Sequence, residues 1–264
     1  GETRAAAHAG AARVWLDSDP EKALALLPEI TNERLHARIH SAMAAYRAME
    51  SPEAGFAYAD SLPDSKMREM ARRSVLESWA ERDPAAASRY LLSQPSPADV
   101  WFTQRAILEW ARLEPEAAVA FTIQHDKPLL DTGIHVPSPL HYAMNHWAAD
   151  DPVSAAGWLS QQPAGLARDR ATGVFAGVVA RQQPDVAIEW ASSIRDRSQR
   201  NSALGVVLGE WGRQDPSRAV AWLETSGYDE DYIRLFKASL ETSLSGDYLS
   251  RSSTNYVHGT IIRY

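Results

Sequence analysis

The stretch Asp151-Pro152-Val153-Ser154-Ala155-Ala156-Gly157-Trp158 contains the pattern that decides the fold. A capping residue stands directly before a proline, a small residue follows three positions later, and a large ring follows six positions after the proline. Aspartate before proline is typical of a helix start, because the carboxylate accepts a backbone N–H at the N-cap and proline is tolerated in the first turn. The stretch therefore predicts that a helix begins at Pro152.

This pattern recurs along most of the chain, each time around a proline that we call the hairpin proline. The hairpin prolines are Pro20, Pro52, Pro84, Pro115, Pro152, Pro184 and Pro216. They are separated by 32, 32, 31, 37, 32 and 32 residues, and a period of roughly 20–50 residues is typical of repeat proteins. The residues before them are Asp19, Ser51, Asp83, Glu114, Asp151, Gln183 and Asp215. Aspartate and serine are good N-caps, whereas Glu114 and Gln183 are expected to be weak ones.

Residues at fixed distances from the hairpin proline form columns that predict the core. Position +3 is small in every unit and holds Ala23, Gly55, Ala87, Ala118, Ala155, Ala187 and Ala219. Position +6 is large and holds Leu26, Tyr58, Tyr90, Phe121, Trp158, Trp190 and Trp222. Position −5 holds Trp15, Arg47, Trp79, Trp110, Trp147, Val179 and Trp211, and we expect Tyr46 to supply the ring that Arg47 lacks. Such regular spacing favours a structural core for these rings.

Each unit is predicted to be a helical hairpin: a longer helix A, a tight turn before the hairpin proline, and a shorter helix B. In the third unit helix A is expected at residues 65–81 and helix B at residues 84–93. A single hairpin cannot bury its apolar face, so neighbouring hairpins are expected to stack into a continuous core. The sequence therefore predicts an all-α fold.

Tandem hairpins with a polar turn, and the D-P-x-x-A-x-x-W pattern of residues 151–158, resemble the tetratricopeptide-like αα-solenoids over about residues 5–228. The resemblance implies a right-handed αα-solenoid of about seven helix-turn-helix repeats, whose A helices line a concave surface that binds a peptide or protein. The chain departs from that family in its usual spacing of 32 rather than about 34 residues, and in the proline that opens helix B. It is therefore identified as a divergent relative or an analogue of that family.

Three regions follow from this pattern: a repeat array at 1–228, a capping helix at 229–244 and a non-repeat tail at 245–264, for which an extended conformation is one alternative. The spacing of 37 residues places an insertion near residues 126–140, which we expect to be a loop on one face of the array. Asp229-Glu230-Asp231 is an acidic first turn suited to a helix N-terminus, and an apolar stripe follows it. The tail contains β-prone residues and no acidic residue after Leu249.

Positions −11 and −7 of helix A lie about one helical turn apart and therefore share a face. From the second unit onward they hold Ser41/Ala45, Arg73/Glu77, Gln104/Leu108, His141/Asn145, Gly173/Gly177 and Gly205/Gly209. Glycine inside a helix costs about 1 kcal/mol relative to alanine, so four glycines in register need a physical reason. One interpretation is close packing of helix A against a neighbour. The other is a partner-binding groove with a polar half (Arg73, Glu77, Gln104, His141 and Asn145) and a smooth glycine floor (Gly173, Gly177, Gly205 and Gly209).

The function we expect is a noncatalytic scaffold that binds a protein or peptide on the concave helix-A surface, as part of a larger assembly. One alternative is an enzyme with its site in the groove around His141. The chain contains none of the common nucleotide-binding, hydrolase or metalloprotease motifs. His141 and His146 are five residues apart on a helix and diverge too far for a ligand pair. We therefore expect no metal and no cofactor.

A second alternative is a helical-repeat protein that binds nucleic acid through a basic stripe. The candidate arginines are Arg68, Arg72, Arg73, Arg168, Arg170, Arg195, Arg197 and Arg200. Acidic residues alternate with them, and the net charge of −7 disfavours binding to a polyanion. The absence of cysteine excludes thiol catalysis, and no apolar run reaches the length of about 18 residues expected of a membrane span. High alanine and arginine content suggests a bacterial source, and both cytoplasm and periplasm are compatible with the sequence.

Overall fold

The structure is a computed structural model that describes residues 2–93, 99–125, 137–227 and 230–244, and every regular element in these ranges is a helix. The predicted all-α class is therefore confirmed. The A helices are α1 (Glu2–Trp15), α3 (Glu33–Glu50), α5 (Ser65–Arg82), α7 (Val100–Leu113), α9 (Pro139–Asp150), α11 (Leu166–Val179) and α13 (Arg197–Gln214). The B helices are α2 (Pro20–Ala25), α4 (Pro52–Asp60), α6 (Pro84–Ser93), α8 (Pro115–Thr122), α10 (Pro152–Gln161), α12 (Pro184–Ser192) and α14 (Pro216–Thr225).

The remaining elements are two short 3-10 helices, η1 (Leu27–Glu29) and η3 (Ile123–His125), and the helix α15 (Glu230–Leu244). Helix α15 lies where the sequence predicts a helix at 229–244. Most of the predicted insertion at 126–140 lies outside the described residues, and its last two residues, Pro139 and Leu140, already belong to α9. The predicted tail at 245–264 also lies outside them.

All seven B helices begin at the hairpin proline, as the sequence predicts. The side chains of Asp19, Ser51, Asp83, Asp151 and Asp215 each accept the backbone N–H three residues further on, at distances of 2.9–3.2 Å. Glu114 and Gln183, the expected weak caps, accept no such bond. Cap chemistry and the fixed φ of proline thus position each A–B turn.

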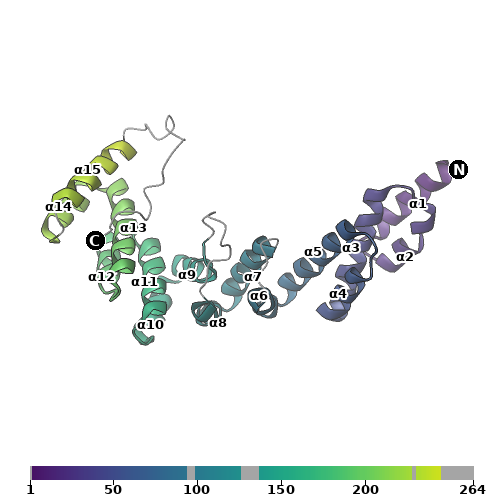
Figure 1. Ribbon diagram of the computed structural model, residues 1–264, viewed down its shortest axis with the longest axis horizontal. Coiled ribbons are helices and arrows are strands. Elements are labelled where there is room, and N and C mark those ends of the chain that lie inside the picture. Colours follow the sequence, from purple (N-terminus) through teal and green to yellow (C-terminus); the bar gives the residue numbers. More distant parts are fainter. Residues whose placement is uncertain (1, 94–98, 126–136, 228–229, 245–264) are drawn as a thin grey trace. The chain divides into compact units, whose positions relative to one another are not determined.

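The described residues form two compact units that divide between Leu113 and Glu114. In the first unit α3 packs against α4 and α5, and α5 packs against α6 and α7. In the second unit α9 packs against α10 and α11, α11 packs against α12 and α13, and α13 packs against α14 and α15. Within each unit, an A helix therefore contacts its own B helix and the next A helix (Figure 1).

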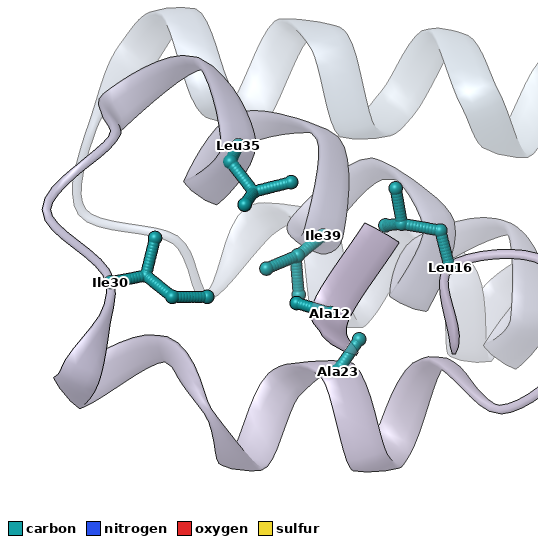
Figure 2. Close-up of a cluster of buried hydrophobic side chains, with 6 residues drawn as sticks. All are labelled: Ala12, Leu16, Ala23, Ile30, Leu35 and Ile39. Atoms are coloured by element: carbon teal, nitrogen blue, oxygen red, sulfur yellow. The ribbon is translucent and has the colours of Figure 1, made fainter. Parts of the chain in front are cut away.

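The core follows the predicted columns most closely at position +3, where every residue is buried. Figure 2 shows one of these residues, Ala23 of α2, in an apolar cluster at the N-terminal end of the first unit. The other members of the cluster are Ala12, Leu16, Ile30, Leu35 and Ile39. Small side chains at +3 let each B helix lie close to its neighbours.

The large rings were predicted to lie in the core, and this holds only in part. At position −5 the side chains of Trp110, Trp147 and Trp211 are buried, whereas Trp15 and Trp79 are half-buried. All residues at +6 are half-buried and line the edge of the core. From the second hairpin onward, the residues at +7 are the buried ones: Ala59, Leu91, Thr122, Leu159, Ala191 and Leu223.

The prediction that Tyr46 replaces Arg47 as a buried ring is wrong. Tyr46 is 43% exposed, because a residue one position away on a helix points in a direction about 100° away. Arg47 instead reaches Glu21 of α2, with 3.5 Å between Nη2 and Oε1. Met43 and Ala44, one turn earlier, fill the core of this hairpin.

Candidate partner-binding surface

Position −7, one of the two predicted groove positions, lies at the contact between successive A helices. Glu77 of α5 has its Oε1 2.7 Å from Nη1 of Arg105, which is position −10 of the next hairpin. A Cβ built on Gly177 of α11 would lie 3.1 Å from Cγ1 of Val206, again position −10 of the next hairpin. The same contact in register is an ion pair in the first unit and an apolar contact in the second. The predicted face is therefore the rim of a seam between A helices.

The two charged groove residues of the first unit already have partners. Glu77 shares Arg105 with Glu81, whose Oε1 is 2.6 Å from Nη2 of that arginine. Arg73 pairs with Glu69 one turn earlier on α5, at 2.5 Å. Exposed ion pairs of this kind contribute little to stability. A peptide bound here would exchange one set of charged partners for another.

The three uncharged polar groove residues are divided between the two units. Gln104 belongs to the first unit, whereas His141 and Asn145 belong to the second, and all three are half-buried. The backbone N–H of His141 donates to Oγ of Ser138, the N-cap of α9, at 3.3 Å. The His141 ring lies edge-on to Tyr142, with the ring centroids 6.2 Å apart. The residues of the predicted polar half are therefore divided between the two compact units.

The four groove glycines fall into two physically different pairs. On α11, a Cβ at Gly173 would be in ordinary contact with Ala203 at 3.5 Å, and a Cβ at Gly177 would be tight against Val206. On α13, a Cβ at Gly205 or Gly209 would have nothing described within 4 Å. Close packing therefore explains Gly177 and gives no reason for the α13 pair.

Several arginines of the candidate basic stripe have a structural role that the sequence analysis missed. His36, Arg68, Arg168 and Arg200 all stand at position −16. Each places a side-chain nitrogen 2.6–3.1 Å from a backbone carbonyl in the last turn of the preceding B helix or in the segment that follows it. These contacts tie the start of each A helix to the chain segment at the end of the preceding hairpin. The recurrence of basic residues at −16 was a visible signal for this role.

A buried carboxylate also joins successive hairpins in the second unit. Asp169, near the start of α11, is only 6% exposed. Its Oδ2 accepts the backbone N–H of Asp196, the N-cap of α13, at 2.9 Å. This bond fixes the start of α13 against α11. From the sequence, Asp169 was only one of the acidic residues that alternate with the candidate arginines, and no spacing rule marked it as buried.

One titratable group with a shifted pKa is His40 of α3. Its Nδ1 lies 2.8 Å from the hydroxyl of Tyr58 in α4. Burial, and secondarily the nearby His36, lower the pKa of His40, while burial raises the pKa of Tyr58. The pair is a hydrogen bond between two neutral groups across the first A–B contact of this hairpin.

In the described ranges no three histidine, aspartate or glutamate side chains gather closely enough to hold a metal ion. Within the same ranges no helix is both long and apolar enough to cross a membrane.

Comparisons with protein-family models, with curated proteins and with solved structures find no match to this chain. The function is therefore inferred from the chain's own repeats. Equivalent positions in successive hairpins show what each position normally contacts, and the exceptions mark candidate sites.

Proposed function

We propose that the chain is a right-handed αα-solenoid of about seven hairpins, a divergent tetratricopeptide-like protein that serves as a noncatalytic scaffold. Its partner, a protein or peptide, binds the helix-A surface. The packing of each A helix on the next within both units supports this arrangement. Glu77 and Gly177, at the same position of two hairpins, each contact the next A helix, which supports a surface built from several hairpins rather than from one helix.

The observation that carries the proposal is the open glycine pair on α13. On α11 the equivalent glycines receive Ala203 and Val206 of the next A helix. On α13, Gly205 and Gly209 receive no described side chain, although both stand inside an 18-residue helix. Two interior glycines together disfavour the helix by about 2 kcal/mol relative to alanine. A partner segment could pack against Gly205 and Gly209 of α13 in the way that α13 packs against the glycines of α11. Such packing would explain why the helix keeps two glycines there.

The experiment compares the partners that the immobilised protein and two variants capture from extracts of its source cells. The test variant is Gly205→Leu/Gly209→Leu, which fills the open surface of α13. Gly157→Leu is the matched control, because Gly157 also has nothing within 4 Å but lies on the B helix α10. Gly173 is unsuitable, because a larger side chain there would strike α13 itself.

We expect the original protein and the Gly157→Leu control to capture the same partner, identified by mass spectrometry, and the α13 variant to lose it by at least tenfold. Circular dichroism checks that all three proteins are equally helical. A partner retained equally by all three would remove α13 from the binding surface. An activity lost in a His141→Ala variant that still captures the partner would instead favour the enzyme alternative.

A further inference from the structure

A second surface is marked by a recurring pairing between successive hairpins. Position +1 of helix B carries a carboxylate in four of the seven hairpins, and in two of these an arginine of the next hairpin pairs with it. Glu21 pairs with Arg47 at 3.5 Å, and Asp185 pairs with Arg218 at 3.1 Å. The contact between a helix B and the next helix A is called a junction here. At two junctions of this chain, a guanidinium pairs with the carboxylate at +1.

Arginine also covers the tryptophan at position −5. The guanidinium carbon of Arg89 lies 4.8 Å from the ring centroid of Trp110, and that of Arg218 lies 5.7 Å from the ring centroid of Trp211. These distances are within the range of cation–π attraction. Arg89 stands at +5 of the preceding B helix and Arg218 at +2 of the same hairpin. Two different positions can thus supply the covering arginine.

The junction between α8 and α9 has the carboxylate and the tryptophan but neither arginine. Glu116 stands at +1 and Trp147 at −5, while Ala120 replaces the residue equivalent to Arg89 and Ser154 replaces the one equivalent to Arg218. Glu116 has no ion pair or hydrogen bond within the described part of the chain. At the α4–α5 junction, which also lacks the arginine, a ring substitutes instead: Phe56 lies edge-on to Trp79 at 6.3 Å.

Short side chains at the α8–α9 junction leave an open depression of about 600 Å³. Its lining includes Glu114, Glu116, Ala120, Trp147, Asp151 and Ser154. All of them belong to the second unit. The floor is apolar and the rim carries three carboxylates, so the depression is complementary to a side chain with an apolar stem and a cationic end.

We propose that this depression binds an arginine side chain of a partner protein or peptide. The guanidinium lies against the carboxylate of Glu116, as Arg218 lies against Asp185, and the methylene groups pack on Ala120 beside Trp147. Arginine suits the site better than lysine, because its planar fork can bind a carboxylate with two nitrogens and stack on an aromatic neighbour. This surface lies outside the α13 surface of the proposed function, and the inference does not depend on that function.

The test uses a defined probe, the blocked pentapeptide acetyl-Gly-Gly-Arg-Gly-Gly-amide, titrated into the isotope-labelled full chain and followed by NMR. We expect saturable shifts of the backbone amide signals of Glu116, Ala117 and Ala120. The same peptide with citrulline, which keeps the shape and removes the charge, is expected to leave these signals unchanged. Equal shifts with arginine and citrulline, or with arginine and lysine, would overturn the proposal, as would the absence of shifts.

Variants that restore the chain's own arginine provide the sharper test. Ala120→Arg recreates the Arg89 position and Ser154→Arg recreates the Arg218 position, so each is expected to fill the site and abolish peptide binding. Ser154 is exposed, and the second variant therefore remains informative if the first disturbs packing. Glu116→Gln is expected to weaken binding about threefold, as befits an exposed ion pair.

The matched control is Glu189→Gln on the exposed face of α12, which removes the same charge elsewhere in the second unit. It is expected to bind the peptide as the original chain does. Binding that survives both arginine variants would show that the peptide binds elsewhere and would overturn the assignment. The Gly205→Leu/Gly209→Leu variant leaves this depression intact. Loss of partner binding to α13 can therefore be distinguished from loss of peptide binding to the depression.

Discussion

Glycine has opposite consequences in α4 of the first unit and α13 of the second. A Cβ on Gly55 would lie 2.8 Å from Cβ of Ala48 and from Cγ2 of Val75, and 2.9 Å from the backbone oxygen of Ala44. A Cβ on Gly205 or Gly209 would meet nothing described within 4 Å. The first glycine is required by packing, and the other two are not.

This difference teaches that a column of small residues in a repeat protein has no single meaning. At +3, where other hairpins carry alanine, Gly55 shows that α4 approaches α3 and α5 too closely for even one methyl group. At −11 and −7 of α13, glycine leaves a surface uncovered at a cost in helix stability. Only the neighbours of each position, and not the residue type, distinguish a packing requirement from a candidate binding surface.

The largest expected effect is on Gly55→Ala. Because two side-chain carbons and a backbone oxygen already occupy the space of the new methyl group, α4 must shift away from α3 and α5. We expect the free energy of unfolding to fall by about 2 kcal/mol, since overpacking outweighs the gain in helix propensity. Urea unfolding followed by circular dichroism measures it. An unchanged midpoint would mean that this hairpin is packed no more tightly than the others.

A second pair of variants compares the polar contacts that join A helices in the two units. Arg82 of α5 donates to the backbone oxygens of Ala48 and Met49, and Gln214 of α13 donates to that of Ala180 at 3.3 Å. We expect Arg82→Ala to lower the free energy of unfolding by about 1.5 kcal/mol, because two charge-assisted bonds are lost. Gln214→Ala, which removes one neutral bond, is expected to lower it by about 0.7 kcal/mol.

The same urea measurement serves both variants, and Arg213→Ala is the control. Arg213 is the neighbour of Gln214 and pairs only within its own helix among the described residues, with Glu210. It is expected to change the midpoint little. Equal losses for Arg82→Ala and Gln214→Ala would contradict a stronger polar seam in the first unit.

How far the sequence predicts this molecule depends on the range of the interaction involved. Hairpin prolines, N-caps and the +3 alanines follow from local rules, and all of them agree with the structure. The side chain of Tyr46 was wrongly predicted to be buried, because the repeat pattern identifies position −5 as buried but does not show where the side chain at the adjacent position −6 points. The α13 glycines could be found from sequence, but whether they were packed depended on α15 and α11, which no local spacing describes. The α8–α9 depression was missed because it is defined by arginines that are absent.

A smaller effect of opposite sign is expected for Gly209→Ala. The new methyl group meets nothing described and the helix gains propensity, so the free energy of unfolding should rise by about 0.8 kcal/mol. Thermal unfolding compared with Gly157→Ala, an open glycine on a B helix, checks whether the gain is general. A loss on Gly209→Ala with a gain on Gly157→Ala would show that the α13 surface is covered by some part of this chain in solution.

The smallest effect concerns pH and should be confined to the first unit. Position −12 is His40 in α3, whereas it is Leu140 in α9 and Leu204 in α13. Burial lowers the pKa of His40, so the unfolded chain binds the proton more readily than the folded chain. The stability contributed by neutral His40 is therefore complete above its ordinary pKa of about 6.5 and is lost as the pH falls below that value toward the lowered pKa.

We expect the variant His40→Leu/Tyr58→Phe to lose less stability than the original chain when the pH is lowered from 8 to 5. The pair is replaced together because Leu alone would leave the Tyr58 hydroxyl without its partner. Urea midpoints at the two pH values measure the difference, with Tyr58→Phe alone as the control that keeps the histidine. If the double variant and this control respond equally to pH, the dependence arises from another titratable group. If only the double variant is less sensitive, the first A–B contact of α3 and α4 is the part of the chain that weakens in acid, while the apolar equivalents in α9 and α13 do not.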